Sequence, residues 1–182
     1  MMEPDLVKGI HGWITDVYIH VIKFFSELGN LPVTSVHVGE CSGTMIDEFN
    51  YLEYVTPFIS RIGREFGAVR LHSCGNADHV MNAICRIENL RIIDTGSNTS
   101  LARIRELMGN DFEINVFPPS EILSEGEDQR EIREWLYKTL KDNNNGNLKI
   151  AYHIEPDYNL SNCMFINDEL DRLRILKKNR IY

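Results

Sequence analysis

The chain has 182 residues, of which 43% are hydrophobic and 25% are charged, as in an ordinary globular domain. Its formal net charge of −8 opposes non-specific binding to nucleic acid or to an anionic membrane surface, so we expect neither as a partner. No segment approaches the ~20 continuous apolar residues of a membrane span.

The four cysteines lie far apart and form no CxxC pair. This spacing does not suggest a disulfide framework. The first residues, Glu3, Pro4 and Asp5, do not resemble the basic start of a signal peptide. The sequence therefore predicts a reduced, cytoplasmic chain.

Two kinds of element alternate along the chain. Residues 5–28 carry apolar side chains at helical spacing, and Gly29 is a suitable helix end. Short β-branched runs predict five strands, at residues 33–38, 68–71, 90–93, 112–117 and 148–153. Helices are predicted to follow them, at about 44–66 with a kink or break at Pro57, through 80–87, at 100–108, at 130–140 and from Asn167.

Strands that alternate with helices at this spacing predict an α/β fold with a parallel sheet, either open and doubly wound or closed into a barrel. No GxGxxG or GxxxxGK[ST] motif follows a strand, which disfavours a nucleotide-binding open sheet. A complete eight-stranded barrel needs about 250 residues. We therefore expect a partial TIM-barrel-like domain of about five parallel β/α units, spanning residues 1–182 as a single domain.

Polar side chains follow the predicted strands, at the edge where parallel β/α folds bind their ligands. The residues at this edge are Glu40, Cys41, His72, Cys74, Asn76, Asp94, Asn115, His153 and Glu155. Turns between strands and helices are generally rich in helix-capping polar residues, so each residue taken alone also fits a structural role. As candidates we assign catalytic roles to Glu40 and Asp94, and cofactor contacts to Asn76, Asn115 and His153.

His72 and Cys74 are two residues apart in extended chain, so their side chains point to the same side. Imidazole and thiolate are ligands that zinc prefers, and a catalytic zinc site has three protein ligands and one open position. The third ligand must come from elsewhere. Cys163, placed in a loop after the last strand, is the first candidate and Cys41 the second. The alternative is a buried cysteine beside a capping histidine.

Residues 71–76 read LHSCGN, which resembles the HxCGN segment of the uroporphyrinogen decarboxylase superfamily, a group that includes the corrinoid-dependent methyltransferases. Residues 43–58 and 162–165 are also similar to segments of that superfamily. The resemblance covers about residues 1–178 and corresponds to the C-terminal part of a longer barrel.

For the methyltransferase branch, the resemblance implies that His72, Cys74 and Cys163 hold a zinc ion. The zinc would bind a thiol substrate, whose thiolate takes a methyl group from a corrinoid carried by a partner protein. Asn162 and Met164 stand where that branch has glycines beside the late cysteine.

Two alternatives stay open. One is cofactorless decarboxylation of a tetrapyrrole in porphyrin biosynthesis, the chemistry of the decarboxylase branch; its arginine-rich N-terminal segment is absent, and residues 161–163 replace its GHG. The other is an inactive partial barrel that needs a companion chain or homo-oligomer, because uncovered strand edges favour pairing.

Overall fold

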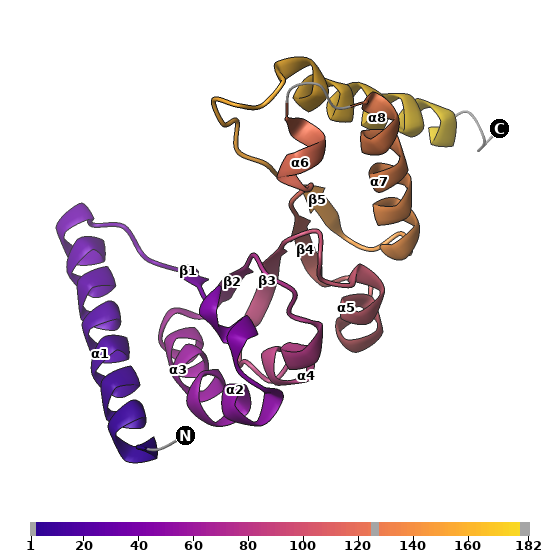
Figure 1. Ribbon diagram of the computed structural model, residues 1–182. Coiled ribbons are helices and arrows are strands. Elements are labelled where there is room, and N and C mark those ends of the chain that lie inside the picture. Colours follow the sequence, from indigo (N-terminus) through magenta and orange to yellow (C-terminus); the bar gives the residue numbers. More distant parts are fainter. Residues whose placement is uncertain (1–2, 125–127, 179–182) are drawn as a thin grey trace.

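The computed structural model describes residues 3–124 and 128–178, and its centre is one parallel five-stranded sheet (Figure 1). The strands follow one another in chain order across the sheet. They are β1 (Val36–Gly39), β2 (Val69–Ser73), β3 (Leu90–Thr95), β4 (Glu113–Val116) and β5 (Leu148–Ile150). This succession, without the reversal of a doubly wound sheet, confirms the predicted partial β/α barrel-like fold.

Helices connect these strands and cover one face of the sheet (Figure 1). The α-helices are α1 (Pro4–Gly29), α2 (Glu48–Tyr54), α3 (Thr56–Phe66), α4 (Met81–Ile84), α5 (Leu101–Met108), α6 (Ser120–Leu123), α7 (Gln129–Asp142) and α8 (Leu160–Lys178). Short 3-10 turns lie at Ser42–Met45 and Asp78–Val80. No helix in the described ranges is long and apolar enough to cross a membrane.

Strand residues alternate between the two faces of the sheet. Val69 and Leu71 of β2 and Ile114 of β4 are fully buried and pack in the main apolar core, which includes residues of α3, α4 and α5. The residues between them, such as Arg70 and His72, point to the opposite face. One face is therefore apolar and covered by helices, and the other is polar.

Two boundaries differ from the sequence prediction in a way that matters for the site. The strand predicted at 148–153 ends at Ile150, because its neighbour β4 ends just before Pro118 and Pro119, which have no N–H to donate. The last helix begins at Leu160 rather than Asn167, because the Asn159 side chain accepts a hydrogen bond from the Ser161 N–H at 2.9 Å.

The break at Pro57 was predicted and is confirmed, since α2 ends at Tyr54 and α3 begins at Thr56.

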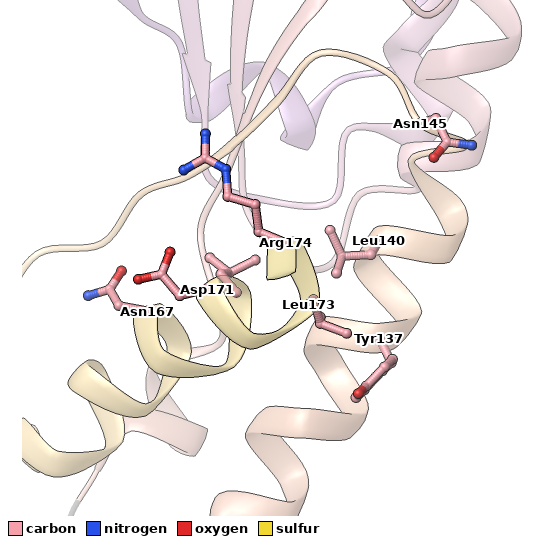
Figure 2. A pocket seen from close by; sticks show the side chains of 8 residues that line it. Tyr137, Leu140, Asn145, Asn167, Asp171, Leu173 and Arg174 are labelled. Carbon is pink, nitrogen blue, oxygen red and sulfur yellow. The ribbon is translucent and has the colours of Figure 1, made fainter. Parts of the chain in front are cut away.

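A second, smaller apolar cluster joins α6, α7 and α8. Beside it, the Glu169 side chain is only 4% exposed and accepts hydrogen bonds from Arg133, Tyr137 and Arg172. The adjoining cavity has a volume of about 760 Å³. Figure 2 shows the side chains that line it, among them Tyr137 of α7 and Arg174 of α8. Its lining comes from these helices and the turn before β5, so this cavity is separate from the carboxyl ends of the strands.

We predict that Glu169→Gln changes the pH dependence of stability. Hydrogen bonds and ion pairs with Arg172 and Arg133 lower the pKa of Glu169 to about 2, below the ~4.3 of an unfolded chain. A lowered pKa adds stability above pH ~4.3 that is lost as the pH falls toward 2. Urea titrations from pH 7 to pH 3 should show a smaller loss of the free energy of unfolding for the variant than for wild type.

The exposed neighbour Asp168 gives the control, as Asp168→Asn should leave the wild-type pH profile unchanged. An identical profile for Glu169→Gln and wild type would contradict the prediction.

Candidate metal centre

The carboxyl ends of β1, β2 and β3 lie side by side and carry the candidate ligands. Gly39 of β1 is in register with His72 of β2, which is in register with Asp94 of β3. Beyond β1 the Glu40 N–H donates to the His72 carbonyl oxygen at 2.8 Å, so the ladder continues into the loop. This continuation brings the residue after Glu40 next to the residues after His72.

Three potential metal ligands converge there. One ligand atom each of Cys41, His72 and Cys74 lies within 4.8 Å of the others. A tetrahedral zinc ion with Zn–S of about 2.3 Å and Zn–N of about 2.0 Å holds its ligand atoms about 3.5–3.8 Å apart. Cys41 and Cys74 are exposed and His72 is half-buried, so their side chains have room to rotate toward bonding distance. The residues therefore fit a metal ion that keeps one position open.

The third member of this group is Cys41, the second of the two cysteines predicted as candidates. The first candidate, Cys163, is 2% exposed on α8, where it packs with Ile122, Leu123, Ile132 and Ile166. Within the described part of the chain it belongs to neither group of potential ligands. It was expected in a loop, and the early start of α8 at Leu160 turns it inward instead.

A second group of ligand atoms, from His37, His72 and Asp94, shares His72 with the first. Asp94 is 1% exposed and accepts hydrogen bonds from Arg70 Nε and Asn115 Nδ2, both at 2.7 Å. The His37 Nε2 atom lies 3.4 Å from the same carboxylate. Because Arg70 already compensates the Asp94 charge, a metal ion would compete with the guanidinium. The cysteine-containing group is therefore the better metal site.

The surroundings of His72 favour a neutral imidazole. Burial lowers the pKa of His72, and the Asp94 charge opposes this only in part. The ring is held edge-on between His37 and Phe117, with centroid distances of 6.1 and 5.8 Å. The neutral form is the one that binds a metal ion.

The two thiols interact with each other. A hydrogen bond with Cys41, followed by burial, raises the pKa of Cys74. A bound cation reverses this effect, because a coordinating thiol loses its proton.

Glycines allow the three strand-end loops to approach closely. A Cβ atom on Gly75 would lie 2.9 Å from Thr44 Oγ1, and one on Gly96 would overlap the Cys74 carbonyl oxygen. Thr44 donates to the Cys41 carbonyl at 3.0 Å, and Thr99 donates to the Gly75 carbonyl at 2.9 Å. The loop that carries Cys74 thus packs closely on the loop that carries Cys41 at Gly75 and Thr44, and Thr99 ties it to the loop after β3.

The remaining predicted site residues lie around the group without joining it. The Glu40 carboxylate is turned toward Gly43 and Tyr51, and burial raises its pKa. Its Oε2 atom and the Tyr51 hydroxyl are buried without a hydrogen-bond partner in the described residues. The roles predicted for Glu40 and Asp94 in catalysis stay predictions.

The three residues predicted to contact a cofactor have structural partners. Asn76 accepts a hydrogen bond from the Asp78 N–H at 3.0 Å, as a turn cap. Asn115 is 5% exposed and binds Asp94, while its Oδ1 atom is buried without a partner in the described residues. His153 is exposed and stacks on Phe117 at 5.9 Å.

Sequence reasoning missed His37 and Arg70, which lie inside strands on the same face as His72. The sequence contained the information needed to place Arg70 beside His72, because residues separated by an even number along a strand share a face. The fold and site together define a parallel β/α protein with a candidate Cys₂His metal centre. No protein-family model and no curated protein matches the chain, so the resemblance at residues 71–76 stays a prediction.

We predict that Gly96→Ala weakens metal binding without touching a ligand. The new methyl group would overlap the Cys74 carbonyl oxygen and displace the loop that carries the thiol. Overpacking of this kind costs about 1–3 kcal/mol of stability, and we expect a loss of roughly tenfold or more in zinc affinity. Competition with a chromophoric chelator measures the affinity, and thermal unfolding measures the stability.

Gly9→Ala is the matched control, because nothing lies within 4 Å of its Cβ position on α1. Equal zinc affinity in Gly96→Ala and Gly9→Ala would show that the close approach does not position Cys74.

Proposed function

We propose that this chain binds zinc through Cys41, His72 and Cys74, and that the bound ion activates a thiol for methyl transfer from a corrinoid carrier protein. The observation that carries the proposal is the convergence of three N and S ligand atoms within 4.8 Å at the strand ends. The class of reaction comes from the resemblance of residues 71–76 to the methyltransferase branch of the uroporphyrinogen decarboxylase superfamily.

The chemistry of the ligands supports zinc. Thiolate and imidazole ligands select soft or borderline ions, and two sulfurs with one nitrogen match the ligands of catalytic zinc sites. When bound, zinc would lower the pKa of a coordinated thiol, so that a thiolate is present at neutral pH. Cys41 and Cys74 are exposed, which leaves the open position accessible to a substrate.

Asp94 is proposed to act as a positioning residue. Its buried carboxylate is held by Arg70 and Asn115, and it belongs to the group of ligand atoms that includes His72. A carboxylate beside a metal-binding histidine fixes the ring orientation and raises its basicity. The coulombic effect of Asp94 on His72, which raises the histidine pKa, is of this kind.

The residues that face the open position have separate tasks in this proposal. His72 stays neutral and binds the ion. Cys41 would bind it from the loop after β1, and Cys74 from the loop after β2. His153, stacked on Phe117 beside His72, borders the site on the β5 side and is available to contact a large methyl donor. The methyl group would pass to the substrate sulfur as the bond from cobalt to carbon breaks, with both electrons left on cobalt.

The first test is metal content. We expect one zinc per wild-type chain by mass spectrometry, and losses in affinity of roughly 100-fold or more for Cys41→Ser, Cys74→Ser and His72→Ala. Cys163→Ala should keep the zinc, because its side chain lies in an apolar cluster on α8. With Co²⁺ in place of zinc, sulfur-to-cobalt absorption should fall with each ligand cysteine removed. Retention of zinc by Cys41→Ser, together with its loss from Cys163→Ala, would assign the third ligand to the other cysteine.

The second test is the reaction. Zinc-loaded protein should accelerate loss of the methyl group from methylcobalamin in the presence of small thiols, with the thioether formed in equal amount. Asp94→Asn should retain zinc and lower kcat about 10–100-fold, since His72 loses its orienting carboxylate. A zinc-loaded protein that is no faster than free zinc with any thiol would refute methyl transfer and leave the metal site intact.

A further inference from the structure

Helix α1 has an apolar face that no other part of the described chain covers (Figure 1). On one side, Thr15 and Ile19 are buried, and the helix packs against α3. On the other side, large apolar residues are 43–71% exposed; they are Leu6, Ile10, Trp13, Ile14, Val17, Val21, Phe24, Phe25 and Leu28. A helix that is apolar on both sides is normally buried on both.

The exposed face has the size of a protein interface. Nine large side chains at these exposures amount to roughly 1,000 Å², which exceeds the 300–600 Å² of the largest apolar patch on a typical monomer. It matches the ~800 Å² that each partner buries in a standard stable interface. Three charged residues of α1, Lys8, Asp16 and Lys23, form ion pairs with α2 and α3 and so point away from this face.

The apolar pattern is symmetric about Val17. Three pairs lie 4, 7 and 11 residues on either side of it, namely Trp13 with Val21, Ile10 with Phe24, and Leu6 with Leu28. At about 100° per residue, all of them lie within roughly 40° of the direction of Val17. Thr15 and Ile19, which are buried against the body of the protein, lie about 160° away from it.

This symmetry indicates that the exposed face of α1 binds a second copy of the same helix. Two copies of α1 that run antiparallel about a two-fold axis at Val17 place each member of a pair opposite its counterpart in the other copy. A two-fold interface requires a patch complementary to itself, and this stripe meets that requirement. The antiparallel arrangement also sets the helix dipoles in a favourable orientation. We infer that the Val17 face of α1 is the interface of an antiparallel homodimer.

The test is the mass of the full chain in solution, by light scattering and sedimentation at several concentrations. Wild type should be a dimer at micromolar concentration. Val17→Glu places two like charges together at the axis and should raise the dissociation constant at least 100-fold, giving a monomer with an unchanged circular dichroism spectrum. Phe49→Glu is the control, because Phe49 is 71% exposed on α2, and it should stay dimeric.

A charge-swap experiment tests the axis itself. Val17→Lys alone should also be monomeric, whereas an equimolar mixture of Val17→Glu and Val17→Lys should dimerise again as the opposite charges meet. A wild-type chain that is still monomeric at a concentration 100-fold above micromolar would overturn the inference. A Val17→Glu variant that remains dimeric would overturn it as well. Both experiments use metal-free protein, so that their outcome is distinguishable from a failure of the proposed zinc site.

Discussion

The parallel register of β1, β2 and β3 determines where every candidate ligand lies. Gly39, His72 and Asp94 are neighbours across the sheet, and Cys41 and Cys74 each follow two residues later in the chain. The same register that joins the strands therefore brings the two thiols together. A slip of one residue between β1 and β2 would exchange the two faces of a strand and separate Cys41 from the His-x-Cys pair. The position of the candidate metal centre is thus determined by strand register as well as by the loops.

The polar face of the sheet depends on the balance of charge at Asp94. A buried carboxylate without a partner costs several kcal/mol, and removing one partner of a buried pair is strongly destabilising. Here Arg70 and Asn115 from the flanking strands each donate to one of its oxygens. The same bonds tie β2, β3 and β4 together on the side that no helix covers in the described residues. The Asp94 carboxylate, which is proposed to orient His72, therefore also holds together the strands around it.

The spacing of apolar residues was sufficient to predict five strands and most of the helices between them, and Pro57 was sufficient to predict the break between α2 and α3, because these features depend on neighbouring residues. The His72–Cys74 pair could also be predicted, since residues two apart in extended chain point to the same side. The third candidate ligand, Cys41, could not be chosen over Cys163 in this way. Its choice depends on the pairing of β1 with β2 and on the Asn159 cap that starts α8 early and buries Cys163. Strand pairing is a long-range contact and the Asn159 hydrogen bond is a helix cap, and neither can be predicted from the spacing of apolar residues.

Helix α1 links its own exposed face to the metal centre through β1. This strand is at one end of the described sheet and has only four residues, so one side of its backbone has no strand beside it. The Tyr18 hydroxyl of α1 donates to the His37 carbonyl oxygen on β1 at 2.7 Å. Cys41 lies two residues after this strand, so its position depends on how firmly α1 is docked. If dimerisation orders α1, then dimerisation must also strengthen the binding of a metal ion at Cys41. By thermodynamic linkage, a metal ion bound at Cys41 must strengthen dimerisation by the same factor.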